Sequence, residues 1–306
     1  MRAVDIRGGT NRADVPASAF AMPAGMKMRY DLPAPELRHT VTGYAIYAAE
    51  PHPPLFNWFL PAPPMICVLL DAGPVSVKVR RHAFGPLAAV SLYGPTSCAF
   101  RAETTGGVQI GIGLSALGWV KLLPHAANLY KDHVIALADV VGDAVAADML
   151  TRLSELDDET MIAPTVDDLL APLFERQAPH EEIIRQFTQL MLLDGVIEIA
   201  DVAERLGLSA TAIRRIATHA FGMPPKFLLR RARFLRSFIA MSRSGEPMSY
   251  GAIDSSYFDA SHFLRDANTF LGTTPRRFMA GETTFLKASL RARAATLGPA
   301  THALHS

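Results

Sequence analysis

A spaced set of residues in the C-terminal third of the chain occurs twice, with an offset of fifty positions. The first copy contains Ser209, Ile213, Arg215, Ala217, Gly222 and Pro225, and the second contains Asp259, Phe263, Arg265, Ala267, Gly272 and Pro275. Each copy opens with a side chain that can accept hydrogen bonds from free amides at a helix start, and each closes with glycine, which permits a left-handed cap. The repeat therefore predicts two equivalent helices.

The first copy is preceded by a second helical pattern. Residues 199–205 predict a short helix, Gly207 opens a tight turn, and residues 210–219 predict the next helix. Glycine in a turn between two short crossed helices is typical of a helix-turn-helix unit, whose second helix is presented to the major groove. The outer face of that helix is expected to read bases, and its residues follow helical spacing: Thr211, Arg214, Arg215 and Thr218.

The segment from residue 205 to residue 236 has eight basic residues and no Asp or Glu, namely Arg205, Arg214, Arg215, Lys226, Arg230, Arg231, Arg233 and Arg236. Such a stretch gains affinity for a polyanion through counterion release, so DNA or RNA is the expected partner. A helix over about 225–242 would couple the two units rigidly. Their reading helices would then lie about 34–36 Å apart if they enter successive turns of the major groove. For Arg233 two interpretations stay open, a brace between the units or a contact with DNA.

These motifs resemble the DNA-binding domain of the AraC/XylS family of transcription regulators. The resemblance covers about the last hundred residues and rests on three segments: 201–209 (DVAERLGLS), 261–265 (SHFLR) and 271–278 (LGTTPRRF). It implies that the outer face of each second helix contacts bases. In this chain those positions are Thr211, Arg214 and Arg215 in the first unit, and Ala260, Ser261, Leu264 and Arg265 in the second.

Both units depart from the family pattern. Ala217 in the first unit and Ala267 in the second replace a common core aromatic residue, and the second unit has Ser255-Ser256-Tyr257 where the family usually has an apolar residue, glycine and phenylalanine. The reading face around Leu264 is poor in side chains that discriminate bases by hydrogen bonds. We therefore expect the first unit to supply most direct readout, and the second to anchor the DNA backbone or contact thymine methyl groups.

The front part of the chain has residue patterns typical of strands. Five runs alternate or cluster apolar residues as strands do, at 40–47, 66–70, 75–79, 88–92 and 108–112. Helical periodicity begins after residue 115, with one amphipathic helix expected over 134–150. The expected fold class is α+β: a mostly-β sensor or dimerisation domain with packed helices, then an all-α domain of two helix-turn-helix units joined by a connector helix.

The expected boundaries follow from these patterns. A loose N-terminal segment covers 1–28, the β-rich effector-binding or dimerisation domain 29–180, the double helix-turn-helix domain 181–283, and a flexible basic tail 284–306. The chain starts with charged residues and has no run long enough to span a membrane, so we expect a cytoplasmic protein.

Enzyme functions have little support in the sequence. Only Cys67 and Cys98 are present, which excludes a disulfide scaffold and a multi-cysteine zinc site. Front-half histidines could serve a cupin-like metalloenzyme, although they lack a close His-x-His pair: His39, His52, His82, His125 and His133. An alkyl-accepting repair protein using either cysteine is the other alternative, without an evident activating histidine. We therefore expect no catalytic residue, metal or cofactor.

The expected partners follow from the regulator interpretation. Double-stranded DNA is the main one. A small-molecule effector, a second copy of the chain in a homodimer, and RNA polymerase are further candidates, and no membrane is expected. Aromatic residues of the front half would either line an apolar effector pocket or form plain core: Tyr44, Tyr47, Phe56, Trp58, Phe59 and Trp119.

Overall fold

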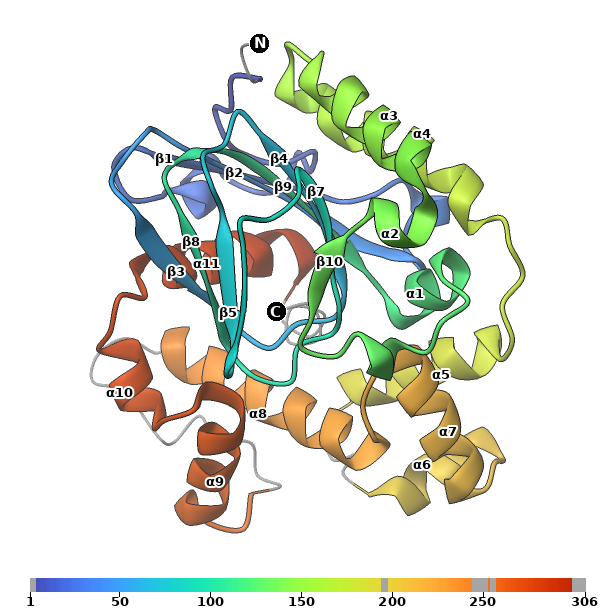
Figure 1. Ribbon diagram of the computed structural model, residues 1–306. Coiled ribbons are helices and arrows are strands. Elements are labelled where there is room, and N and C mark those ends of the chain that lie inside the picture. Colours follow the sequence, from blue (N-terminus) through green and yellow to red (C-terminus); the bar gives the residue numbers. More distant parts are fainter. Residues whose placement is uncertain (1–3, 194–197, 244–252, 254–256, 299–306) are drawn as a thin grey trace.

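The chain has a β-rich part followed by a helical part, as expected from the sequence. The computed structural model describes residues 4–193, 198–243, 253 and 257–298. Figure 1 shows the strands gathered in the upper part of the molecule and most of the C-terminal helices along its lower edge, while the last helix lies among the strands. The α+β fold class is thus confirmed.

The strands form two antiparallel sheets. The larger sheet has the order β1-β2-β9-β4-β7-β10 and the smaller one β3-β8-β5-β6. Their bounds are β1 Met26–Asp31, β2 Val41–Ala49, β3 Leu55–Phe59, β4 Met65–Leu70, β5 Ser76–Val79, β6 His82–Phe84, β7 Val90–Tyr93, β8 Phe100–Thr104, β9 Gly107–Leu114 and β10 Val134–Ala136. All five predicted strand runs are confirmed, with ends shifted by one or two residues. In β9 every second residue is buried, which is the period that a half-buried strand requires.

The helices follow the strands in two groups. The first group covers the larger sheet and consists of α1 Ala116–Leu122, α2 Ala138–Val141, α3 Asp143–Ser154 and α4 Ile162–Leu170. The second group consists of α5 Glu181–Leu192, α6 Ile199–Leu206, α7 Ala210–Phe221, α8 Pro225–Arg243, α9 Ala260–Leu271, α10 Pro275–Met279 and α11 Thr284–Leu297. None of the helices in the described ranges is long and apolar enough to cross a membrane.

The single helix predicted over 134–150 is wrong. Residues 134–136 form β10, which pairs with β7, and the remainder is divided between α2 and α3. Gly142 separates these two helices with φ 90°, a conformation that an L-residue in a continuous helix does not adopt. The apolar residues that suggested one helix therefore serve a sheet edge and two helices.

The N-terminal segment was predicted to be loose, which is wrong for its described residues, 4–28. Val4 and Ile6 are 4% and 5% exposed and belong to the main core. The amide of Gly9 donates to the carbonyl of Met28 over 3.0 Å, alongside the sheet. The segment is ordered because it packs onto β1, a contact that local composition does not reveal.

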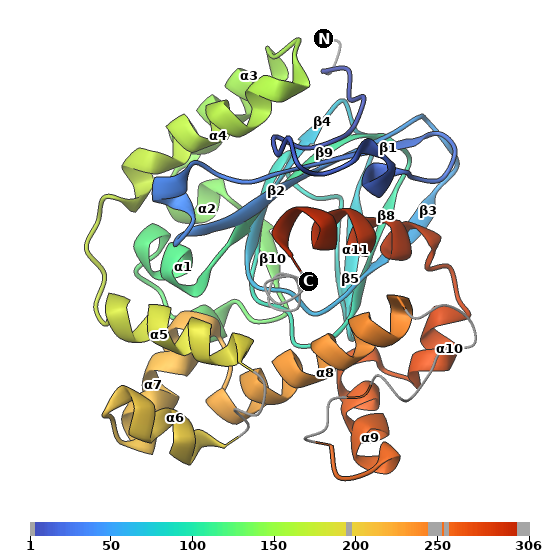
Figure 2. The ribbon, with the colours of Figure 1, turned by 180° about the vertical axis from the view of Figure 1, so that it is seen from behind.

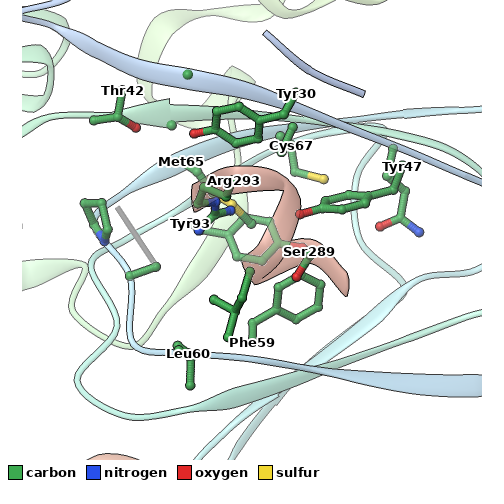
Figure 3. Close-up of a pocket in the computed structure, with 18 of the residues that line it drawn as sticks. Tyr30, Thr42, Tyr47, Phe59, Leu60, Met65, Cys67, Tyr93, Ser289 and Arg293 are labelled. Carbon is green, nitrogen blue, oxygen red and sulfur yellow. The ribbon is translucent and has the colours of Figure 1, made fainter. Parts of the chain in front are cut away.

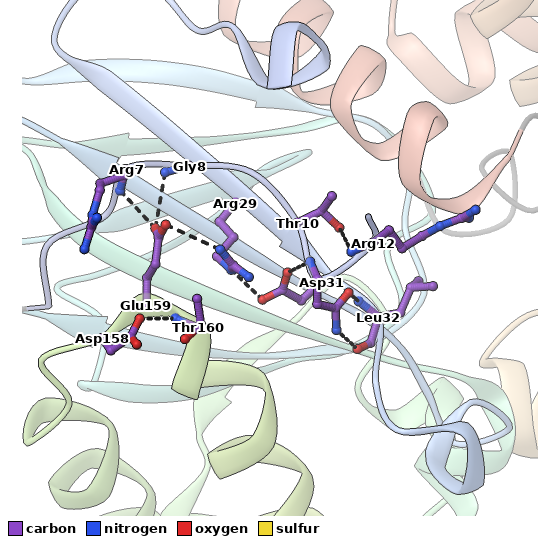
Figure 4. Close-up of polar contacts among 11 residues, drawn as sticks. Arg7, Gly8, Thr10, Arg12, Arg29, Asp31, Leu32, Asp158, Glu159 and Thr160 are labelled. Carbon is purple, nitrogen blue, oxygen red and sulfur yellow. Dashed lines mark hydrogen bonds and ion pairs between the residues drawn. The ribbon is translucent and has the colours of Figure 1, made fainter. Parts of the chain in front are cut away.

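Buried charges hold this segment in place, as Figure 4 shows. The carboxylate of Glu159 accepts hydrogen bonds from the amides of Arg7 (2.9 Å) and Gly8 (3.2 Å). Arg29 bridges Glu159 (3.4 Å) and Asp31 (2.6 Å). Burial nevertheless raises the pKa of Asp31, because desolvation outweighs the hydrogen bond from Arg29. This network joins the N-terminal segment, β1 and the 3-10 turn Glu159–Met161 that precedes α4.

The C-terminal tail was predicted to be flexible, which is wrong for residues 284–297. These residues form α11, which lies across the strands in Figure 2 and buries Phe285, Leu286 and Leu290. Residues 299–306 lie outside the described part of the chain. The ordered helix is explained by an apolar face that only the folded sheet can cover.

Candidate nucleic-acid interface

The repeat in the sequence corresponds to two helices with the same caps. Ser209 Oγ accepts from the amide of Ala212 over 3.2 Å at the start of α7, and Asp259 Oδ1 accepts from the amide of His262 over 2.6 Å at the start of α9. Each helix ends at a glycine in the left-handed region, Gly222 with φ 76° and Gly272 with φ 77°. The predicted equivalence is confirmed.

Helices α6 and α7 form the first helix-turn-helix unit. Gly207 ends α6 with φ 61°, and the amide of Leu208 donates back to the carbonyl of Ala203 over 3.1 Å. The inner side of the unit is apolar, with Val202 and Ala217 both 0% exposed. A small residue at 217 fits this tight crossing of the two helices.

The predicted reading face of α7 points away from this core. Thr211, Arg214 and Arg215 are exposed, and Thr218 is half-buried. Neither arginine has a described hydrogen bond or ion pair within the chain that would hold its guanidinium away from a ligand. The four side chains share one helix face, while their contact with DNA remains a prediction.

The predicted face of α9 is also open, but smaller. Ala260, Ser261 and Arg265 are exposed, and Leu264 is half-buried. Because Leu264 is half-buried, less of its side chain is available for contact with DNA than at a fully exposed position. The other predicted departures, Ser255 and Ser256, lie outside the described residues.

Half of the eight basic residues in segment 205–236 are directed into the protein. Fewer of them are therefore available to a polyanion than the sequence predicted. Arg231 and Arg233 are 6% and 5% exposed, Arg230 pairs with Asp266, and Arg236 donates to the carbonyl of Met191 over 3.1 Å. The reason is that α8 packs against neighbours on most of its circumference, so its arginines lie between helices. Four of the eight residues remain exposed: Arg205, Arg214, Arg215 and Lys226.

A buried carboxylate joins α8 to α9. Asp266 is 0% exposed, and Arg233 donates to its Oδ2 over 3.1 Å while Arg230 donates to its Oδ1 over 3.0 Å. The hydroxyl of Tyr257 donates to the same carboxylate over 2.9 Å, and the Arg233 guanidinium lies 4.1 Å from the centre of the Tyr257 ring. The open question on Arg233 is thereby answered: it braces the second unit. Asp266 was not predicted; an acidic residue on the inner face of α9 was the available signal.

Both helix-turn-helix units touch the β-rich part. A Cβ added to Gly222 would come within 2.5 Å of Pro95 Cγ and 3.1 Å of the Ala127 carbonyl oxygen. At the second unit, the amide of Ala99 donates to the carbonyl of Phe270 over 2.7 Å. A displacement in the sheet region would therefore act directly on either unit.

Helix α8 sets the spacing of the two units. Its 19 residues correspond to about 28 Å at 1.5 Å per residue. Helices α6 and α7 lie at one end of α8, and α9 and α10 lie at the other, on the edge of the molecule remote from α3 and α4 (Figures 1 and 2). A helix of this length is a stiff connector, as the sequence predicted.

The β-rich part contains a cavity of about 80 Å³ between the larger sheet and α11, shown in Figure 3. Of the predicted pocket aromatics, Tyr47 and Phe59 line it, whereas Tyr44 and Trp119 are fully buried core residues. Further lining residues that were not predicted to line a pocket include Tyr30, Met65, Cys67, Tyr93, Gln109, Leu286, Ser289, Leu290 and Arg293. The C-terminal helix thus supplies one wall of the cavity.

The enzyme alternatives gain no support from the front half. Across the described ranges, no three His, Cys, Asp or Glu side chains come together as metal ligands. Burial raises the pKa of Cys67 to about 12 and also raises that of Cys98. A nucleophilic or alkyl-accepting thiol needs the opposite shift.

The chain was compared with known proteins. Residues 202–281 match the family described as a helix-turn-helix domain. Among solved structures, ToxT from Vibrio cholerae is 9% identical, with 76% of this chain and 98% of that chain covered and a TM-score of 0.42. The AraC-like transcriptional activator CuxR is 13% identical, with 69% and 86% covered and a TM-score of 0.26. No curated protein matches the chain.

The two capped helices, their shared connector and the matched family define the class: this chain is a DNA-binding transcription regulator of the helix-turn-helix kind. More narrowly, its segment 202–281 is a double helix-turn-helix domain of the AraC type.

Proposed function

We propose that the protein binds one bipartite DNA site, with α7 and α9 entering successive major-groove turns on the same side of the duplex. The observation that carries the proposal is the pair of identically capped helices at the two ends of α8. A rigid connector makes binding of the second helix nearly unimolecular once the first is bound, which raises the affinity for a correctly spaced site.

The two units have different roles in this proposal. Arg214 and Arg215 supply direct readout, since an arginine can donate two hydrogen bonds to a guanine edge. Arg265 contacts phosphate, because its neighbours Ala260 and Ser261 offer little to a base edge. Thr211, Thr218 and Leu264 complete the two faces with apolar or single hydrogen-bond contacts.

The β-rich part acts as the control domain. A small molecule in the cavity beside α11 is the proposed effector, and the contacts at Gly222 and Ala99 are the routes by which it acts on the units. A homodimer and a contact with RNA polymerase stay predictions.

Selection of bound sequences from random double-stranded DNA tests the proposal. We expect a motif of two parts separated by about one helical turn. On the selected site Arg214→Ala and Arg215→Ala should each lose about 1–3 kcal/mol of binding free energy, with much less loss on random DNA.

The matched control is Arg152→Ala, because this half-exposed arginine lies on α3, outside both reading faces. It should bind the selected site as the parent does. Equal losses on selected and random DNA for Arg214→Ala and Arg215→Ala would reduce both residues to phosphate contacts, and failure to enrich any sequence would refute specific binding.

A further inference from the structure

The inner face of the larger sheet is hollow beneath α11. Gly43, Ala45, Gly111 and Gly113 line the cavity there, on β2 and β9, so this part of the wall is formed by backbone and one methyl group. Such a hollow in an otherwise close-packed interior needs an occupant, since an empty space loses dispersion contacts along all its walls.

Helix α11 is that occupant, and it fills the hollow with side chains from one continuous face. Four of its residues line the cavity at helical spacing i, i+3, i+4 and i+7: Leu286, Ser289, Leu290 and Arg293. The guanidinium of Arg293 lies 5.5 Å from the centre of the Tyr30 ring, whereas the hydroxyl of Ser289 donates to the carbonyl of Leu286 over 3.0 Å; Figure 3 labels Tyr30, Ser289 and Arg293. With α11 in place only about 80 Å³ remains, about half the volume of an engineered cavity that holds benzene.

Outside the cavity, α11 is attached by apolar packing and by hydrogen bonds. The ring of Phe285 lies 5.0 Å from that of Tyr47, and Ala292 is 0% exposed in an apolar cluster with Phe20. Arg291 donates to the carbonyls of Ala19 (3.2 Å) and Ala21, and Arg12 donates to the carbonyl of Thr296 over 2.7 Å. These bonds join exposed or half-exposed groups, where each hydrogen bond contributes little net free energy. The helix is therefore held by the surface that it buries in the cavity together with the apolar packing of Phe285 and Ala292.

Helix α11 is also joined to the second reading unit by a short path. Residues 280–283 alone separate it from α10, and Phe278 of α10 packs edge-on against Trp58 of β3, with ring centres 5.3 Å apart. Displacement of α11 would pull on α10 and hence on α9.

We propose that α11 is an internal ligand of the sheet cavity, and that a neutral, largely apolar molecule binds there by displacing it. The ligand class follows from the walls. Without α11 and its Arg293, none of the described lining residues carries a formal charge, and Tyr30, Tyr93 and Gln109 offer hydrogen bonds from neutral groups. Burial raises the pKa of Tyr30 to about 12, so this hydroxyl stays uncharged in the physiological range.

Only the last step of this proposal, the change in DNA affinity, rests on the proposed regulatory function. Ligand exchange itself is tested without DNA. Cys67 lies in the cavity wall and is 5% exposed, so its labelling by a maleimide in a Cys98→Ser background reports opening of α11. Nile red serves as the neutral apolar probe, and 1-anilinonaphthalene-8-sulfonate as an anionic one.

Two variants loosen α11 in different ways. Leu286→Ala with Leu290→Ala removes the apolar contacts in the cavity, and Arg291→Ala removes the outer hydrogen bonds while leaving the cavity face intact. In both we expect Cys67 to be labelled faster by about tenfold or more, and Nile red to bind more tightly by a similar factor, because the competing closed state is less populated. Leu170→Ala, a fully buried leucine on α4, is the control for general destabilisation and should change neither.

Three results would overturn the proposal. Faster Cys67 labelling with unchanged or weaker Nile red binding would show that the hollow is not a binding site. Equal changes in Leu170→Ala would assign the effect to global unfolding. Tighter binding of the anionic probe that is lost in Arg293→Met would show that the ligand binds against α11 and does not replace it.

Discussion

Asp266 is the residue that joins the connector helix to the second reading helix. It is completely buried, and its carboxylate accepts hydrogen bonds from Arg230, Arg233 and Tyr257. A buried charge of this kind is tolerated only because several donors replace its lost hydration. The orientation of α9 on α8 therefore depends on one side chain that never approaches DNA.

Asp266→Asn should lower the free energy of unfolding by about 3–5 kcal/mol, because two arginines lose their buried counter-charge. Urea denaturation followed by circular dichroism measures this loss. Asp168→Asn, at a carboxylate that is 76% exposed, should change stability by less than about 1 kcal/mol. Similar small changes in both variants would show that the Asp266 network contributes little.

Cys67 gives a pH dependence with a defined sign. Burial raises the pKa of this thiol in the folded protein from 9.0 to about 12, so the folded state holds its proton where the unfolded chain has lost it. The stability that this thiol contributes is therefore complete below pH 9 and declines as the pH rises towards about 12.

The measurement is the difference in unfolding free energy between Cys98→Ala and the double variant Cys67→Ala/Cys98→Ala across that range. The difference should shrink with rising pH. A difference that stays constant would mean that the thiol ionises equally in the folded and unfolded protein.

At the level of elements, the glycines that end α7 and α9 form a natural pair for comparison. Gly222 and Gly272 have almost the same positive φ, so a side chain costs each about 1–2 kcal/mol of backbone strain. Their surroundings differ: a Cβ at Gly222 would collide with Pro95, whereas one at Gly272 meets nothing within 4 Å.

Gly222→Ala should therefore destabilise the protein by about 1–3 kcal/mol more than Gly272→Ala, which is the usual cost of overpacking. Thermal or urea unfolding of both variants gives the comparison. Equal losses would indicate that the first unit is not pressed against the β-rich part at this point.

The elements also show what the sequence could and could not reveal. Capping residues, the turn glycine and strand alternation are local signals, and they predicted α6, α7, α9 and β9 correctly. Strand β1 was missed because its Lys27, Arg29 and Asp31 look like surface charges, and two of them are buried only through pairing with each other and with distant Glu159.

Helix α11 and the inward arginines of α8 were missed for the same reason. Whether a basic residue such as Arg231 faces DNA or a carbonyl of the β-rich part depends on packing between segments 135 residues apart. The candidate reading residues lie at exposed or half-buried positions of α7 and α9, and their contact with DNA stays a prediction, while the brace at Asp266 needed the folded structure.

At the scale of the whole molecule, two apolar clusters connect the β-rich part to the helices of the C-terminal part. The main apolar cluster extends from strands of the larger sheet through Trp119 of α1 to Ile213 of α7 and Leu228 of α8. The second unit has its own cluster around Phe234 and Phe263, which also includes Leu60 and Ala99 of the β-rich part. The two reading helices are thus fixed to one body, and their spacing is a property of that body.

Hydroxyl-radical footprinting of the parent on its selected DNA site tests this spacing most directly. The structure predicts two protected windows on one side of the duplex, centred about 10 base pairs apart, with the window of the first unit weakened in Arg214→Ala and Arg215→Ala. A single short window, or two windows on opposite sides of the duplex, would contradict the claim that α8 presents α7 and α9 together.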